Sequence, residues 1–234
     1  MKFAIVPTSN LDRVLSTAEQ LLKRAVGLPG MAAVIGTPGA GKTIATGCAA
    51  TRFNAIYERA LPTWTTRAML AALCGHLGLR PSPRIEPMWN AIIGALRARP
   101  RLVIIDEADL IRDFVTIEML RALYDLSEAP VMLVGTPNFR QRLRRHEQLA
   151  ARMLRTVEFV PLSIEEVCQV VSRLSDVIFD EELIERLHKS AHSFRRLVVE
   201  IAALERRAVR VGAQRVTLAD WPGAAPAEPA RRVA

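Results

Sequence analysis

Residues 36–43, Gly-Thr-Pro-Gly-Ala-Gly-Lys-Thr, decide the fold. They fit the P-loop pattern, in which four residues separate a first glycine from a Gly-Lys-Ser or Gly-Lys-Thr triplet. The stretch follows a short apolar run, residues 31–35, and precedes a segment of helical character that starts at Lys42. A strand, a glycine-rich turn and a helix in this order predict a phosphate-binding turn at the end of a buried strand.

The chemistry of this turn predicts a site for ATP and Mg²⁺. Glycines allow the chain to turn tightly, so that successive backbone N–H groups converge on phosphate oxygens. Lys42 can bridge the β- and γ-phosphates, and the Thr43 hydroxyl can bind Mg²⁺. The predicted nucleotide-binding residues are Gly36, Thr37, Pro38, Gly39, Ala40, Gly41, Lys42 and Thr43, together with Asp106 from a second motif.

The second motif places two carboxylates at the end of another buried strand. Residues 102–107 read Leu-Val-Ile-Ile-Asp-Glu, and ligands of open α/β sheets gather at the carboxyl ends of the strands. We expect Asp106 to hold Mg²⁺ through water, so that Thr43 and Asp106 form the metal site. We expect Glu107 to orient and deprotonate the attacking water. The alternative is a strand that ends in two solvated acids.

A third apolar run, residues 131–135, ends in small polar groups. Beside the strand that carries Glu107, the hydroxyl of Thr136 can sense the γ-phosphate or hold the attacking water, and Asn138 is the fallback. Ordinary turn chemistry after a strand is the alternative.

The order of the elements predicts an α/β fold with two parts. Strands that alternate with helices and are apolar on both faces predict a parallel sheet covered on both sides. After Pro161 the pattern changes to three helices, which Ser163, Asp180 and Ser193 are expected to cap. We therefore expect a P-loop base domain with an N-terminal helix over residues 1–161, a small helical lid over 162–218 and a disordered Pro/Ala-rich tail over 219–234.

Composition limits the class of protein. The chain has 234 residues, of which 50% are hydrophobic and 24% charged, so a wholly disordered protein is excluded. No apolar run approaches the roughly 18 residues of a membrane helix, and the N-terminus does not resemble a secretory signal. The three cysteines, Cys48, Cys74 and Cys168, contain no CxxC pair and suit a reducing cytoplasm. The net charge of +8 favours a polyanionic partner, although arginine-rich composition alone could produce it.

Two arginines stand out by their position. Arg152 precedes the predicted last strand, residues 156–160, and Arg195 opens the third helix of the lid. An arginine at a subunit interface can neutralise charge on a neighbour's γ-phosphate, and one in a lid can do so in its own subunit. Taken alone, either residue could equally be a surface arginine.

The sequence resembles the AAA+ ATPases and, within them, the phage Mu B transposition proteins. The Tn7-type TnsC and TniB regulators are similar more distantly. The stretches that carry the resemblance are IGTPGAGKT at 35–43, LVIIDEAD at 102–109, VGT at 134–136, LAARM at 149–153 and HSFRRLV at 192–198. The resemblance implies a base domain with a helical lid, ATP-dependent assembly into a ring or helical filament on DNA, and delivery of target DNA to a transposase in the bacterial cytoplasm.

The same resemblance assigns roles to single residues. Arg152 matches the arginine finger that acts on a neighbouring subunit, Arg195 the sensor-2 arginine, and Thr136 the sensor-1 position. With Glu107 they form the predicted catalytic set. Two departures are visible: the Mu protein has an N-terminal helix-turn-helix domain without a counterpart in this sequence, and His192 stands where a lid glycine precedes the sensor arginine.

The resemblance also implies where double-stranded DNA would bind. In AAA+ assemblies, DNA usually runs through a central channel lined by loops that follow the second strand and precede the third helix. The residues of this sequence in those regions are Arg59, Thr63, Thr65, Arg67 and Arg112. The alternative DNA surface is a dense arginine cluster over residues 140–155, which could instead be a subunit interface.

Three classes of function remain to be compared. The leading hypothesis is an ATP-dependent, sequence-indifferent binder of double-stranded DNA that selects transposition targets. The runner-up is a helicase-loader ATPase of the DnaC or IstB type, which would bind a protein partner and single-stranded DNA. A secretion-type or signalling ATPase would need a membrane- or peptidoglycan-binding extension, and we expect no membrane partner.

The first prediction concerns Lys42. We expect Lys42→Ala to abolish nucleotide binding, because the substitution removes the positive charge from the β- and γ-phosphates. Binding of a fluorescent ATP analogue measures the effect. An unchanged affinity would contradict the assignment of the P-loop.

Overall fold

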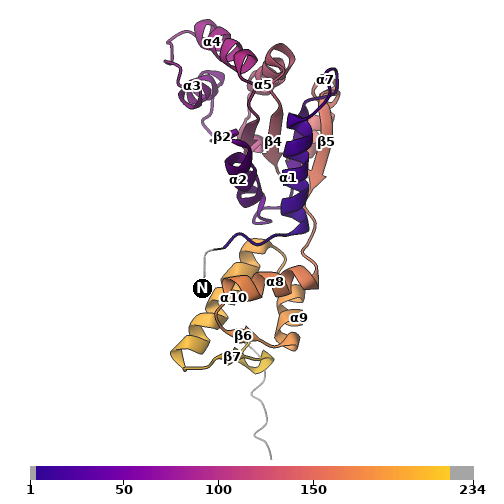
Figure 1. Cartoon of the computed structure of the whole chain (residues 1–234), viewed down its shortest axis with the longest axis vertical. Helices are drawn as coiled ribbons and strands as arrows, with labels where there is room; N and C mark the ends of the chain where they lie inside the picture. Colours follow the sequence, from indigo (N-terminus) through magenta and orange to yellow (C-terminus); the bar gives the residue numbers. More distant parts are fainter. Residues whose placement is uncertain (1–3, 222–234) are drawn as a thin grey trace, which may run out of the picture. The chain divides into compact units, whose positions relative to one another are not determined.

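Five parallel strands form the central sheet of the larger part of the protein (Figure 1). The structure is a computed structural model and describes residues 4–221. The order across the sheet is β2-β3-β4-β1-β5, so the strand before the P-loop lies between β4 and β5. The strands are β1 (Met31–Ile35), β2 (Ile56–Arg59), β3 (Val103–Asp106), β4 (Val131–Gly135) and β5 (Met153–Glu158).

Both faces of this sheet are apolar and covered by helices. Side chains alternate between the faces along each strand, so Ala32 and Val34 pack on one side and Ala33 and Ile35 on the other. Helices α1 (Ser9–Leu22) and α2 (Lys42–Phe53) cover the first face. The second face packs against α3 (Thr66–His76), α4 (Ile85–Ala98), α5 (Phe114–Ser127), α6 (Pro137–Arg144) and α7 (Glu147–Ala150). The predicted α/β fold class is confirmed.

The last strand begins earlier than the sequence predicts. β5 runs over Met153–Glu158 instead of residues 156–160, so that it directly follows Arg152. Only Val157 is buried among its residues, because β5 is an edge strand with one free side. The alternation of apolar residues that marks a strand in the sequence is therefore weak here.

Residues 4–8 and 161–221 form a second compact unit. Its helices are α8 (Ile164–Leu174), α9 (Glu181–Ser190) and α10 (Phe194–Arg210). The three predicted caps are present: Ser163 forms a reciprocal capping box with Glu166, Asp180 accepts from the N–H of Leu183, and Ser193 accepts from the N–H of Arg196. Val6, predicted within the base domain, is buried among these helices.

Two short elements complete this unit. The strands β6 (Ile178–Phe179) and β7 (Arg215–Val216) pair in parallel and are too short to leave a periodic signal in the sequence. The predicted tail starts inside the 3₁₀ helix η2 (Leu218–Asp220), and Trp221 packs on the unit with the Arg186 guanidinium over its ring. Residues 222–234 of that tail lie outside the described residues.

No helix between residues 4 and 221 combines the length and the apolar character that a membrane span requires.

Gly135, the last residue of β4, lies in closely packed surroundings that a substitution can test. A Cβ on Gly135 would lie 2.7 Å from Phe139 Cδ1 and 2.9 Å from Asp109 Oδ1, and Phe139 is fully buried. We expect Gly135→Ala to lower the free energy of unfolding by about 1–3 kcal/mol. Gly94→Ala, where a Cβ meets nothing within 4 Å in the middle of α4, is the control and should raise it by roughly 0.5–1 kcal/mol. Denaturant unfolding measures both, and an unchanged stability of Gly135→Ala would contradict the packing.

Candidate nucleotide-binding site

The P-loop joins β1 to the first turn of α2. Gly39 and Gly41 have φ angles of 78° and 97°, which side-chain-bearing residues rarely adopt, so glycine is needed at both positions. The Lys42 ammonium donates to the carbonyls of Gly36 and Thr37 at 2.7 and 3.1 Å and holds the turn together. The first N–H groups of a helix have no partner within that helix, so the turn at the start of the 12-residue α2 is suited to binding phosphate.

The carboxylate of Asp106 is the centre of the site. The residue is 1% exposed. Oδ2 accepts from the Thr43 hydroxyl at 2.8 Å and from the Tyr57 hydroxyl at 2.7 Å, and Oδ1 accepts from the backbone N–H of Glu107 at 2.9 Å. The structure therefore brings together the two residues predicted to hold Mg²⁺ and adds Tyr57.

Tyr57 is held as a neutral phenol. Partial burial and the hydrogen bond to Asp106 raise the pKa of its hydroxyl well above the ordinary value. A carboxylate can only accept, so Tyr57 is the donor in this bond.

Glu107 follows Asp106 in a left-handed backbone conformation with a φ of 53°. Such a conformation costs an ordinary residue roughly 1–2 kcal/mol. Its carboxylate pairs with Arg59, with 3.1 Å between Arg59 Nη2 and Glu107 Oε1, and both side chains remain partly exposed. Arg59, predicted to contact DNA, thus lies against the predicted general base.

Thr136 lies at the carboxyl end of β4, between the P-loop strand and the strand of Asp106. Its backbone N–H donates to Asp109 Oδ1 at 3.0 Å, and its hydroxyl does not cap the following helix. Asp109 holds this position from the 3₁₀ helix η1 (Ala108–Leu110), which follows β3. Asn138 is exposed on α6.

Arg152 lies at the amino ends of the strands, opposite the end of the sheet that carries the P-loop. Its carbonyl accepts from the N–H of Met31 at the start of β1, whereas the P-loop follows the end of that strand. The five residues of β1 span roughly 16 Å, more than an arginine side chain can bridge. The guanidinium pairs with Asp125 on α5, with 3.1 Å from Nε to Oδ1.

Arg195 belongs to the second compact unit. It is exposed in the first turn of α10, two residues after the cap Ser193. Its predicted role as the sensor-2 arginine stays a prediction.

The residues predicted to contact DNA lie near the carboxyl ends of the strands, at the edge of the sheet where the P-loop also lies. Thr63, Thr65, Arg67 and Arg112 are exposed, and the Thr65 hydroxyl also caps α3. A hydrogen bond of 2.7 Å between the hydroxyls of Thr66 and Thr116 ties the start of α3 to the start of α5. The two predicted loops therefore lie side by side.

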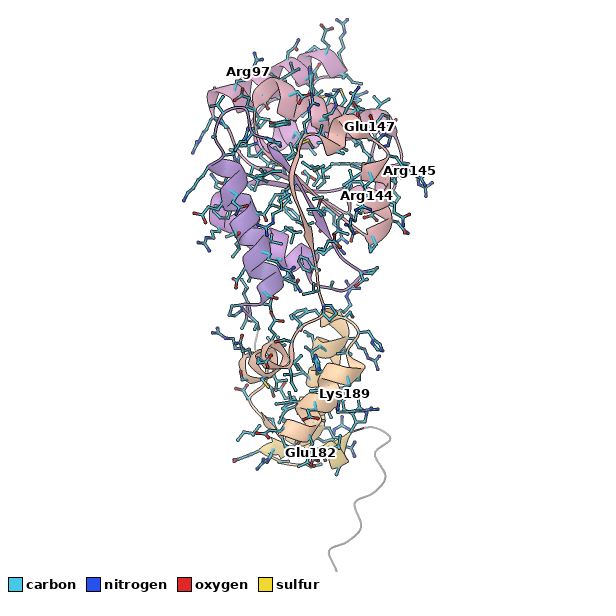
Figure 2. All side chains as sticks on the ribbon, turned by 90° about the vertical axis from the view of Figure 1, so that its right-hand side faces the viewer. Arg97, Arg144, Arg145, Glu147, Glu182 and Lys189 are labelled. Atoms are coloured by element: carbon cyan, nitrogen blue, oxygen red, sulfur yellow. The ribbon has the colours of Figure 1, made fainter. Side chains whose placement is uncertain are left out.

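The arginine cluster over residues 140–155 divides into two kinds of side chain. Arg140 pairs with Glu158 at 2.7 Å, and Arg142 donates to the carbonyls of Asp109 and Ile111. Arg144 and Arg145 are exposed at the end of α6 and project outward near Glu147 (Figure 2). Much of this positive charge is therefore used within the fold.

Comparison with known proteins identifies the family. The family described as AAA domain matches residues 26–143, which include the P-loop and the carboxylates of β3. The chain belongs to the AAA domain family. It is therefore an ATPase, and membership of this family implies nucleotide binding. No curated protein matches this AAA protein in sequence at a significant level.

Solved structures share the fold of this AAA protein at low identity. The Aeropyrum pernix ORC1 protein in complex with DNA has a TM-score of 0.63 and 16% identity over 90% of this chain and 63% of its own. The ORC2 protein of the same organism, in ADPNP and ADP complexes, has a TM-score of 0.70 and 15% identity over 92% and 68%. The Thermotoga maritima RuvB Holliday junction branch migration motor has a TM-score of 0.62 and 19% identity over 90% and 66%. The chain thus spans about two thirds of the length of these proteins.

The residues of this AAA protein fit Mg²⁺ with a nucleotide. Mg²⁺ prefers oxygen ligands, and in P-loop ATPases a P-loop Ser or Thr and an Asp from a neighbouring strand hold it. The Thr43 hydroxyl donates its one hydrogen bond to Asp106, which leaves the lone pairs of the Thr43 oxygen for a cation.

Two polar residues of the site were missed from the sequence. Asp109 lies at the end of residues 102–109, but its contact with the N–H of Thr136 joins two strand ends and leaves no local signal in the sequence. Tyr57 gave no signal of its own. Its contact with Asp106 requires that β2 lie beside β3, and a single sequence does not give the order of strands.

The pair between Arg152 and Asp125 can be measured. A double-mutant cycle of Arg152→Ala and Asp125→Ala should give a coupling free energy of about 0.5–1 kcal/mol, because both side chains are partly exposed and water screens their attraction. Denaturant unfolding at two salt concentrations supplies the values, and high salt should weaken the coupling. A coupling indistinguishable from zero at low salt would show that the pair contributes nothing in solution.

Proposed function

We propose that this AAA ATPase assembles on double-stranded DNA with ATP and Mg²⁺ bound, and delivers that DNA as a target to a transposase, as Mu B-like proteins do. The observation that carries the ATPase part is the hydrogen-bonded group of Thr43, Asp106 and Glu107 beside the P-loop. The DNA part rests on charge and on the edge formed by the two loops, and the transposition part on the motif resemblance.

Each residue near the P-loop has a task in hydrolysis. Lys42 and the backbone N–H groups of the turn would bind the phosphates, and Thr43 and Asp106 would hold Mg²⁺, which neutralises developing charge when bound. Glu107 would accept a proton from the attacking water. Its left-handed backbone supports this role, because such conformations are concentrated at functional sites. Thr136 would report on the γ-phosphate from the end of β4.

The two arginines outside the P-loop would complete the site. Arg152 lies too far from its own P-loop to act there, which supports its action on a neighbouring subunit. In that state it would exchange Asp125 for a phosphate. Arg195 would contribute from the lid of the same subunit.

Charge favours DNA binding by the larger unit. Residues 9–160 contain 20 Lys and Arg against 13 Asp and Glu, whereas residues 161–221 contain 9 against 10. The exposed Arg67 and Arg112 and the Thr63 and Thr65 hydroxyls suit contacts to phosphates, which require charge or a donor but no base recognition. Binding of this kind is indifferent to sequence and sensitive to salt.

Arg59 connects the two activities. It pairs with Glu107 and stands at the edge assigned to DNA. A DNA phosphate at this edge would compete with Glu107 for the guanidinium, so that DNA would release the carboxylate to act on water.

Fluorescence anisotropy of labelled random-sequence duplex DNA tests the proposal. We expect tight binding with ATP and Mg²⁺ that is lost with ADP or without nucleotide and is weakened steeply by salt. Glu107→Gln should keep DNA bound after ATP is added, because it binds ATP without hydrolysing it. Arg112→Ala should weaken binding and lower the salt slope by about 1. Arg99→Ala, an exposed arginine at the opposite end of β3, should leave both unchanged.

The remaining outcomes separate the alternatives. Preference for single-stranded DNA would favour the helicase-loader class and direct attention to a protein partner. ATP-dependent duplex binding without stimulation of transposase-mediated strand transfer would leave a DNA-binding ATPase and remove the transposition role. If Arg112→Ala and Arg99→Ala lower the affinity for DNA equally, the total positive charge of the protein, and not this edge of the sheet, determines DNA binding.

A further inference from the structure

We propose that Tyr57 is a positioning residue of the ATPase site, which holds the Asp106 carboxylate in the orientation that Mg²⁺ binding requires. The inference rests on the proposed binding of ATP with Mg²⁺. Tyr57 lies in β2, where the register pairs it with Ile104 of β3, two residues before Asp106. Its half-buried hydroxyl donates to Asp106 Oδ2 at 2.7 Å.

The acceptor positions of Asp106 are nearly filled by the protein. A carboxylate has about four lone-pair positions, two on each oxygen. Tyr57 and Thr43 use those of Oδ2, and the Glu107 N–H uses one of Oδ1. One acceptor position on Oδ1 remains, which suits a contact to Mg²⁺ through a bound water.

Tyr57 therefore acts on the cation through two other residues. With the Tyr57 hydroxyl in place, rotation of the Asp106 carboxylate would break a hydrogen bond from Tyr57, from Thr43 or from the backbone N–H of Glu107. The Thr43 proton then has a fixed acceptor, and the Thr43 lone pairs have a fixed direction. Without the Tyr57 hydroxyl, Oδ2 keeps a single donor and the carboxylate gains freedom to turn. Loss of such supporting contacts typically lowers metal affinity 10- to 100-fold.

Tyr57→Phe separates this role from simple packing, because it keeps the ring and removes only the hydroxyl. Tyr124→Phe is the matched control: Tyr124 is the second of the two tyrosines, and its hydroxyl donates to the Leu28 carbonyl on the surface. Binding of a fluorescent non-hydrolysable ATP analogue is titrated with Mg²⁺ and repeated in EDTA. Thermal unfolding in EDTA reports any general loss of structure.

We expect the Mg²⁺ concentration for half-maximal analogue binding to rise about tenfold in Tyr57→Phe. Binding in EDTA should equal that of the wild type, and Tyr124→Phe should match the wild type throughout. If the Mg²⁺ concentration for half-maximal analogue binding is unchanged or lower in Tyr57→Phe, the inference is overturned. A wild type whose nucleotide binding ignores Mg²⁺ would instead refute the proposed metal site, so the two failures are distinguishable.

A second protein covers the case in which Tyr57→Phe does not fold. Incorporation of 3-fluorotyrosine into the Tyr124→Phe background modifies Tyr57 alone and retains its O–H donor. We expect its Mg²⁺ dependence to stay within about twofold of the wild type, because the supporting hydrogen bond is preserved. A rise of about tenfold in the Mg²⁺ concentration for half-maximal binding in this protein would contradict the role of the Tyr57 donor.

Discussion

The buried carboxylate of Asp106 is the constraint on which the site depends. A carboxyl group with almost no exposure is tolerated when hydrogen-bond donors surround it. Its hydrogen-bond donors come from α2, from β2 and from the residue that follows it in sequence. One carboxylate therefore fixes the P-loop helix, the neighbouring strand and Glu107 relative to each other. The need to satisfy one charge therefore also orders the groups that surround it.

Local patterns predicted much of this arrangement, and long-range pairing limited the rest. The P-loop, the strand of Asp106 and the caps Ser163, Asp180 and Ser193 follow from residues adjacent in sequence, because turn glycines, apolar runs and capping side chains act over a few residues. Tyr57 and the pair of Arg59 with Glu107 depend on β2 lying beside β3. β5 starts at Met153, earlier than the sequence predicts, because an edge strand buries few of its side chains and its apolar pattern is weak.

Arginine count is a poor guide to free positive charge in this protein. Arg97, Arg101 and Arg142 donate to backbone carbonyls, and the planar guanidinium of Arg142 links α6 to η1 and to Ile111, the residue after it. These side chains close helix and loop ends that would otherwise leave acceptors unpaired. The net charge of the chain therefore overstates its exposed positive charge, which belongs to arginines such as Arg67, Arg112, Arg144 and Arg145.

The position of Arg152 across the sheet from its own P-loop has a consequence for symmetry. If it serves a neighbour, the contact joins two different surfaces, and repetition of such a head-to-tail contact gives a ring or an open helix but never a two-fold dimer. In an open assembly the subunit at one end receives no arginine from a neighbour. Each open chain then holds one incomplete site whatever its length, so short assemblies hydrolyse less ATP per subunit than long ones. Closure into a ring removes that difference.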